Sequence, residues 1–469
     1  MYNSNVLKIL KSFSKTELRD LGKFVQSPYF NQREDVLMLF NYLAQHLGSA
    51  PILFEKEKIY TILYANKPYD DAALRFTMHS LLKVIRQYLA QKEWESNDID
   101  VQLSLAKSMR KRGFDDYFEK EMTNSEVLIK ENPYRNADFH YMNYLLEIEK
   151  VDSITFMRRK GDMPFEELFE ALNSFYISGL LKNACAALYN KTTTFEKYQL
   201  PLLDTVIEWV EKNENLYENT EGVAIRIYFN ALMALKTNQN KYFEVLKKLI
   251  HKNWMLFPKS EARVLYLQAI NFCIKRINAN ELGFLNEFFD LMQSGLENKC
   301  LFENGVLSKF TYTNAVTVSL RLEKYEWSKL FIEEYKIFLH PKDREAAYNF
   351  NLATYFYRLN DYDNALKLLQ LADFGDVQTN LHARSVQMRI YFEINEIEAL
   401  TSLMDSTQTY IQRQKDIGYL KDNYLNLIKF IKKIFKLDMK NKAEKEKLLE
   451  EINDTKNVVE KQWLLDKLK

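Results

Sequence analysis

The scarcity of glycine and proline constrains this chain more than any other feature of its sequence. The 469 residues contain 11 Gly and 8 Pro, about 2% each, where average usage is near 7% and 5%. Sheets, barrels and doubly wound folds need glycine in their tight turns and phosphate-binding loops. Because this chain cannot supply many such turns, we expect an all-α protein. More than about 65% of its residues should be helical, far above the globular average near one third, and no sheet of three or more strands should form.

Charge, cysteine content and hydropathy exclude several classes of protein. There are 65 Lys and Arg against 64 Asp and Glu, a net charge of +1, so any contact with nucleic acid or an anionic membrane would need a local patch. Cys185, Cys273 and Cys300 are far apart and fit no disulfide framework or zinc knuckle, so we expect reduced, buried thiols. Without a membrane-spanning stretch or a signal peptide pattern, the expected location is cytoplasmic, with no membrane partner.

Residues 1–95 are expected to form a small N-terminal helical domain. Ser14 and Glu17 match a capping box that opens a helix, and Ser27-Pro28 ends it. A polar, acidic stretch near residues 93–100 marks the boundary with a second domain, residues 96–469. The further helices expected in the first domain cover about 33–46, 55–64 and 70–91.

From about residue 101 the sequence becomes a succession of amphipathic helices joined by short polar turns. In the clearest unit, which begins at Ala346, the small residues Ala353 and Ala365 let two antiparallel helices approach closely. Large neighbours, Phe356 and Tyr362, fill the remaining space. Weaker copies, about 35–43 residues apart, predict an α-solenoid of divergent helical hairpins. Their expected turns are Gly113-Phe114-Asp115, Asn240-Lys241-Tyr242, Glu323-Lys324-Tyr325 and Asn395-Glu396-Ile397, and Val245, Ser328 and Leu400 stand in the place of Ala365.

The unit at Ala346 resembles a tetratricopeptide repeat. Leu352-Ala353 stands at the Leu-Gly pair of that motif, Phe356 at its aromatic position, and Ala365 and Ala372 at its later small positions. Asn349 and Val377 depart from the family's Trp and Pro. Over residues 309–410 the resemblance implies helix pairs that bind a protein or peptide segment on a concave face.

The same resemblance assigns first-helix positions to that concave face. The family's Lys/Asn clamp is missing, so the resemblance implies apolar and aromatic contacts with Arg321 and Arg358 at the rim. The full set of expected groove residues is Thr313, Thr317, Leu320, Arg321, Phe350, Thr354, Tyr357 and Arg358.

Both ends of the chain carry a further expectation. The first 95 residues resemble helical-repeat proteins of Bacteroidota, with Ser27-Pro28-Tyr29-Phe30-Asn31 as the most distinctive piece, and this likeness implies no activity. A helix expected over about 445–468 keeps Leu448, Ile452, Val459 and Trp463 on one side. We interpret it as a cap on the final hairpin; a coiled-coil arm is the alternative, and the oligomeric state stays open.

No motif in the sequence indicates catalysis. Asp373-Phe374-Gly375 spells the metal-binding triplet of kinases, but no Gly-rich loop or catalytic loop accompanies it. No two of the six histidines have zinc-ligand spacing. We therefore expect no catalytic residues, no metal and no cofactor, and a protein that is not an enzyme.

One local charge anomaly lies in the helix expected over 70–91. From Ala72 to Lys92 it contains no acidic residue. Its basic stripe, as we call it, is Arg75, His79, Lys83 and Arg86, which fall within about 80° on a helical wheel; the opposite arc is Leu74, Met78, Leu81, Leu82, Ile85 and Leu89. The stripe could meet nucleic-acid phosphates. We favour a solvated face that pairs with Glu55 and Glu57 or with an acidic partner protein.

These observations predict a non-catalytic scaffold or adaptor that binds a protein segment along its solenoid. The alternative is a regulator whose N-terminal domain contacts nucleic acid while the repeats sense a peptide or protein. The basic stripe separates the two hypotheses, because internal salt pairing of Arg75, Lys83 and Arg86 would remove the support for the second.

Overall fold

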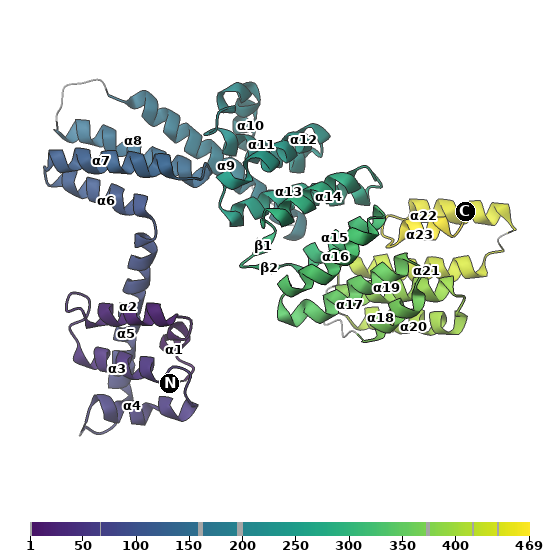
Figure 1. The fold of residues 1–469 in the computed structure, drawn as a ribbon, viewed down its shortest axis with the longest axis horizontal. Helices are drawn as coiled ribbons and strands as arrows, with labels where there is room; N and C mark the ends of the chain where they lie inside the picture. Colours follow the sequence, from purple (N-terminus) through teal and green to yellow (C-terminus); the bar gives the residue numbers. More distant parts are fainter. Residues whose placement is uncertain are drawn as a thin grey trace. The chain divides into compact units, whose positions relative to one another are not determined.

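The architecture is all-α, as the sequence predicts. A computed structural model of the protein describes residues 2–65, 67–157, 163–194, 200–371, 376–414, 417–438 and 440–469. It is 78% helical, and neighbouring helices pack in pairs (Figure 1). The chain forms two compact units. Unit 1 comprises Met1–Asn132 and Ala137–Tyr176, and unit 2 comprises Pro133–Asn136 and Ile177–Lys469.

Unit 1 begins with short helices that gather around one long helix, α5. The helices are α1 (Asn5–Leu10), α2 (Lys15–Gln26), α3 (Glu34–Gln45), a 3₁₀ turn η1 (Pro51–Phe54), α4 (Lys56–Leu63), α5 (Asp71–Glu95), α6 (Asp98–Lys111), α7 (Asp115–Glu131), α8 (Ala137–Met157) and α9 (Phe165–Thr194), which continues into unit 2. Ser14 and Glu17 form the predicted capping box, and Asp70 accepts from Ala72 N and Ala73 N at the start of α5. Local capping therefore fixes these helix starts, as the sequence indicates.

The first 95 residues have an apolar core of their own within unit 1. Its fully buried members come only from residues 6–88 and include Leu21, Leu39, Leu74 and Ile85. A separate apolar cluster joins α6, α7 and α8. The break between α5 and α6 falls at Ser96-Asn97, inside the polar stretch expected to end the first domain. The domain boundary at residue 95 itself stays a prediction.

Unit 2 is a succession of helical pairs. Its elements are α10 (Leu203–Lys212), η2 (Glu214–Tyr217), α11 (Val223–Thr237), α12 (Asn240–Asn253), η3 (Trp254–Leu256), α13 (Lys259–Asn278), α14 (Phe284–Glu297), β1 (Phe302–Glu303), β2 (Val306–Leu307), α15 (Lys309–Arg321), α16 (Tyr325–Tyr335), η4 (Lys336–Phe338), α17 (Pro341–Arg358), α18 (Tyr362–Leu371), α19 (Val377–Glu393), α20 (Ile397–Arg413), α21 (Tyr419–Lys436), α22 (Lys442–Asp454) and α23 (Lys461–Asp466). The β1–β2 pair is antiparallel, and Asn304-Gly305, both at positive φ, makes its turn.

A residue in the left-handed conformation marks the turn of six hairpins in the described residues. These residues are Gly113, Asn238, Asn280, Glu323, Asn360 and Asn395. In five of the turns the next N–H donates to the carbonyl five residues earlier, as Asp361 N does to Phe356 O at 3.0 Å. This bond satisfies a carbonyl that the end of the first helix would leave without a partner. The turns recur irregularly, 35 residues apart from Asn360 to Asn395 and 43 from Asn280 to Glu323, as predicted.

The side chains that pack between the two helices of each pair stand at fixed distances from the turn residue. Seven positions earlier every side chain is at most 1% exposed: Ala106, Ala231, Cys273, Val316, Ala353 and Met388. Five positions later all are buried too: Phe118, Phe243, Leu285, Ser328, Ala365 and Leu400. Ala353 and Ala365 are both fully buried in one cluster, as the hairpin packing requires. Buried Ser328 is satisfied by Ser319, Oγ to Oγ 2.7 Å.

One predicted turn was misplaced. The turn before α12 is Asn238-Gln239, so Asn240-Lys241-Tyr242 already belongs to the helix. Phe243, and not the half-buried Val245, takes the inter-helix position. The sequence pattern placed the turn two residues late because Val245 is smaller than Phe243, although large residues such as Phe118 and Leu285 also take this position in other pairs. The triplet Asp373-Phe374-Gly375 and Ala372 lie outside the described residues.

Candidate partner-binding surfaces

The residues expected to line a groove divide into buried and exposed groups. Leu320, Phe350 and Tyr357 are only 2%, 7% and 8% exposed. Phe350 and Tyr357 belong to the apolar cluster that also holds Ala353 and Ala365. They pack inside the array, so their burial does not favour them as contact residues, and the groove assignment stays a prediction. The remaining expected groove residues are more accessible: Thr317, Arg321 and Arg358 are exposed, and Thr313 and Thr354 are half-buried.

Neighbouring residues of unit 2 cover the two predicted aromatic residues. The guanidinium of Arg389 lies over the Tyr357 ring, 4.7 Å from its centroid. Arg389 in turn donates from Nη1 to Oε2 of Glu460 at 3.0 Å. The ring of Phe350 lies 6.4 Å from the His382 ring. The face expected to hold a partner is thus occupied, at Tyr357, by α19 and by the segment that precedes α23.

The basic stripe of α5 is exposed along its whole length. Arg75 pairs with Asp71 at 2.6 Å, one turn earlier on the same helix. His79, Lys83 and Arg86 form no ion pair with any residue that the structure describes. The expected pairing with Glu55 and Glu57 is not found among these residues; Asp71 instead bridges Arg75 and Lys56, the latter also at 2.6 Å.

The apolar arc of α5 also differs from the prediction at one end. Leu74, Leu81 and Ile85 are fully buried, whereas Leu89 is 39% exposed. Leu89 lies beyond the part of α5 that the shorter helices cover, since the buried cluster of this region ends at Tyr88. A helical wheel cannot show where the neighbours of a helix stop.

A polar network holds α5 against α3 and α4. The Asp35 carboxylate accepts from Arg33 Nη2 at 2.6 Å, from the Tyr64 hydroxyl at 2.6 Å and from Thr77 Oγ1 at 2.8 Å. Burial alone would raise the pKa of Asp35, but these hydrogen bonds outweigh it and hold that pKa well below its ordinary value. Arg33 also stacks on the exposed Phe76 ring at 4.5 Å. The network is structural and fixes the orientation of the basic stripe.

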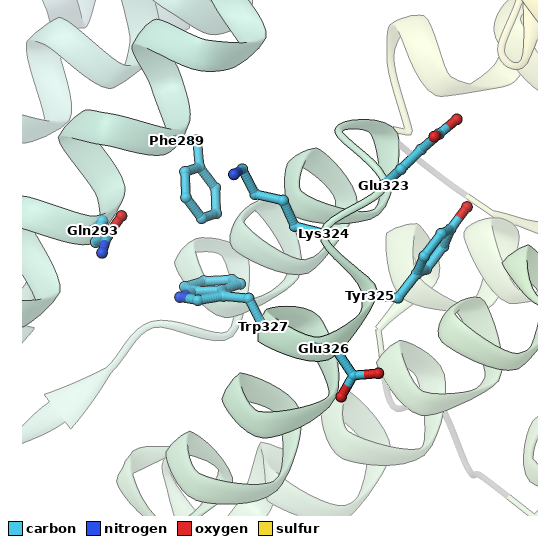
Figure 2. Close-up of a pocket in the computed structure, with 7 residues that line it drawn as sticks. All are labelled: Phe289, Gln293, Glu323, Lys324, Tyr325, Glu326 and Trp327. Atoms are coloured by element: carbon cyan, nitrogen blue, oxygen red, sulfur yellow. The ribbon is translucent and has the colours of Figure 1, made fainter.

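A cleft of about 410 Å³ lies between α14 and the start of α16. Figure 2 shows Phe289, Lys324 and Trp327 pointing toward one another. The Phe289 and Trp327 rings meet edge to face with centroids 4.8 Å apart, and Lys324 Nζ lies 4.9 Å from the Phe289 centroid. Gln293, Glu323, Tyr325 and Glu326 complete the lining. The floor of the cleft is therefore aromatic and its edge is charged.

An equivalent cleft of about 400 Å³ lies one hairpin earlier, between α12 and the start of α14. Phe284 stands four residues after its turn residue Asn280, as Trp327 stands four after Glu323. Phe284 meets Phe243 edge to face at 5.6 Å. The cleft edge carries Glu244, Glu281 and Glu287. In two successive hairpins, the aromatic residue four positions after the turn thus lines a cleft against the preceding second helix.

The sequence contained signals for these residues that motif comparison does not use. Trp327 and Phe284 both follow a hairpin turn at the same distance, so alignment on turn residues would have matched them. Arg389 is flanked by Met388 and Ile390, which are both buried; a cation inside such an apolar run needs a partner. Nothing in the local sequence identifies Glu460 as that partner, because 71 residues separate the two.

The structure offers no reactive cysteine among the three. Cys185, Cys273 and Cys300 are unpaired and buried, as predicted. Burial raises the pKa of the Cys185 thiol to about 12 and that of Cys300 to about 11, so neither is a thiolate near neutral pH. Within the described ranges, no three His, Cys, Asp or Glu side chains gather as metal ligands. In the same part of the chain, no helix combines the length and apolar character that crossing a bilayer requires.

Comparison with known proteins adds no assignment to this geometry. The tetratricopeptide and Bacteroidota resemblances therefore remain predictions from the sequence. The chain matches no protein-family model, no curated protein and no solved structure.

Proposed function

We propose that this chain is a non-catalytic scaffold that binds a protein segment. The observation that carries the proposal is the pair of aromatic-floored clefts at equivalent places between α12, α14 and α16. Buried Phe350 and Tyr357 cannot serve as the contact residues without rearrangement, so the proposal moves from the first-helix face to these second-helix clefts.

The chemistry of the clefts suggests the kind of segment that fits them. Each cleft is large enough for apolar side chains, and its lining includes one partly exposed ring, Trp327 or Phe284, packed against a buried one. At their edges Glu244, Glu323 and Glu326 form no ion pair with any described residue. A segment with two apolar anchors and neighbouring Lys or Arg residues matches this pattern. Two modest contacts on one array would reinforce each other through effective concentration.

A peptide-display selection against the full chain tests the proposal. The library of short random peptides is selected on the wild type, and binders are measured against Trp327→Ala, with the exposed Trp209→Ala in the same unit as the matched control. We expect enriched peptides to carry apolar and basic residues and to bind Trp327→Ala at least about tenfold more weakly. Peptides that bind both variants equally would exclude the clefts as the site.

Charge reversal provides a second, independent test that does not remove a packed ring. Glu323 and Glu326 are both exposed, so Glu323→Lys/Glu326→Lys should leave the fold intact. The selected basic peptides should lose affinity, and more so at low salt, because the attraction is screened as ionic strength rises. Unchanged affinity at low salt would show that the acidic edge plays no part.

The regulator with a nucleic-acid-contacting N-terminal domain is the second candidate. One observation favours it: His79, Lys83 and Arg86 are exposed on one face of α5 and form no ion pair with described residues. Internal salt pairing of the basic stripe would have counted against this hypothesis, but among its residues only Arg75 is paired with a described residue. A single helix with few cations supports weak, sequence-independent phosphate contacts, so the scaffold remains the preferred proposal.

A further inference from the structure

Two successive first helices end in an arginine, and a third arginine, on the next first helix, lies over the buried Tyr357 ring. Arg321 is the last residue of α15, and Arg358 is the last residue of α17. Each stands two residues before the left-handed turn residue of its hairpin, Glu323 or Asn360. The two therefore occupy the same register position on neighbouring helices.

The third arginine, Arg389 on α19, is held far more tightly. Its side chain is 7% exposed, lies over the Tyr357 ring, and donates to Glu460 at 3.0 Å. Its Nε is buried and has no hydrogen-bond partner in the described part of the chain. A guanidinium has five N–H donors in a planar fork, so this one is left with unused donor capacity.

The same side chains influence one another electrostatically. Partial desolvation of the Arg321 guanidinium, although the residue is exposed as a whole, and the positive charge of Arg358 lower the pKa of Arg321, and the carboxylate of Glu460 opposes that change. Burial raises the pKa of Tyr357, and Arg389, Glu460 and Arg358 all act on the same hydroxyl. Arg321 and Arg358 themselves form no ion pair with any described residue.

Among the described residues, only one of the three arginines, Arg389, has an ion-pair partner. Glu393 is already engaged by Trp463 Nε1 at 3.0 Å and by Lys467 Nζ at 2.6 Å. Glu460 is the carboxylate that pairs with Arg389, and it is itself 28% exposed. Glu460 also has φ 56°, an uncommon conformation for a non-glycine residue. The chain holds a carboxylate at this place despite an unfavourable backbone.

We propose that Arg321, Arg358 and Arg389 form a binding site for the carboxylates of an acidic protein segment. Glu460 occupies part of this site in the isolated chain and is displaced or joined when the segment binds. Its ion pair with Arg389 demonstrates the recognition chemistry, and the two exposed arginines supply the positive charge that Glu460 leaves unmatched. The inference uses different side chains from those that line the aromatic clefts and does not depend on them.

Fluorescence anisotropy on the full chain tests the inference. The probe is a fluorescein-labelled peptide of repeated Glu-Asp-Ser, and the reference is the same peptide with Gln and Asn in place of Glu and Asp. We expect the acidic peptide to bind more tightly than the neutral one, and Arg321→Ala/Arg358→Ala to weaken it by about tenfold. Arg413→Ala, an exposed arginine elsewhere in the unit, is the matched control and should have no effect.

Glu460→Gln gives a result that a merely structural cluster would not give. It removes the competing charge at nearly constant size, so acidic-peptide affinity should rise several-fold. Equal binding of the acidic and neutral peptides to the wild type would overturn the inference. Undiminished binding to the double-arginine variant, or weaker binding to Glu460→Gln, would overturn it as well.

Discussion

The protein carries two cationic surfaces, and they are built in different ways. The basic stripe of α5 places Arg75, His79, Lys83 and Arg86 along one helix, all exposed. The proposed arginine cluster of unit 2 combines Arg389, which lies over a buried ring, with Arg321 and Arg358 at matching positions of two neighbouring helices. The stripe is recognisable in the sequence as a periodic pattern, whereas the cluster is formed by residues up to 68 positions apart.

The difference shows that similar charge does not mean similar binding capacity. Cations on one exposed helix keep their hydration and rotamer freedom, so each contact is weak and is screened by salt. Arg389 is already desolvated and fixed on the Tyr357 ring, and its orientation is set when the chain folds. A ligand carboxylate at the cluster therefore meets a partly preorganised donor set. We expect selectivity at the cluster and only weak attraction at the stripe.

The largest expected contrast between the two surfaces is in stability. Arg389→Ala removes the ion pair to Glu460 and the contact with Tyr357, and should destabilise unit 2 by about 2–3 kcal/mol. Lys83→Ala on the stripe should change stability by less than about 0.5 kcal/mol. Chemical denaturation of the full chain, with hydrogen exchange to localise the loss to α17 and α19, measures both. Equal effects would mean that Arg389 is no better anchored than a surface lysine.

The next prediction concerns the packing of α17, the helix that carries Arg358, against α18. Ala353 and Ala365 are fully buried between α17 and α18, so Ala365→Leu should overpack the hairpin and cost about 1–3 kcal/mol. The melting midpoint should fall. Ala90→Leu on α5 is the matched control, because Ala90 is an exposed alanine at which the larger side chain should be neutral. An unchanged midpoint for Ala365→Leu would remove the register assigned to this pair.

A third prediction concerns the network behind the basic stripe. Asp35→Asn should weaken the attachment of α5 to α3 and α4 by about 1–2 kcal/mol, because Arg33 loses its carboxylate partner. The folded-state pKa of Asp35 lies below its unfolded value. Its contribution is therefore complete above about pH 4 and is lost as the pH falls further.

Hydrogen exchange in α3, α4 and α5 of the full chain, compared at neutral pH and near pH 3, measures this loss. The wild type should lose protection as the pH falls, and Asp35→Asn should lose less over the same range. A wild type and variant with the same pH dependence would show that Asp35 does not hold the helix.

The smallest expected effect concerns nucleic acid. If the stripe bound duplex DNA through three phosphate contacts, the log–log slope of affinity with salt would be about −2 to −3. We predict no binding tighter than the nonspecific range of roughly 10⁻⁴–10⁻⁶ M, and no effect of Arg75→Ala/Lys83→Ala/Arg86→Ala on the capture of selected peptides. Loss of a nanomolar nucleic-acid complex in that triple variant would favour the regulator instead.

Features that depend on a few neighbouring residues could be predicted from the sequence. The Ser14–Glu17 capping box, the Asp70 cap and the turns at Glu323 and Asn395 involve groups at most a few residues apart. Glycine and proline scarcity predicted the helical architecture for the same reason, since turn chemistry is local. The β1–β2 hairpin also had a local signal, Asn304-Gly305, which the average composition of the whole chain does not reveal.

Whether a side chain at the candidate sites is buried, exposed or ion-paired depended on which distant segments pack against it. The sequence alone determined that Tyr357 and Arg358 lie at the end of a first helix. Only the tertiary structure decided that Tyr357 is covered by Arg389 while Arg358 stays exposed. It likewise decided that Glu460 meets Arg389 and that Lys83 and Arg86 meet no described acid. The physical reason is that helix formation and capping depend on local backbone bonds, whereas burial and ion pairing depend on segments far apart in the chain.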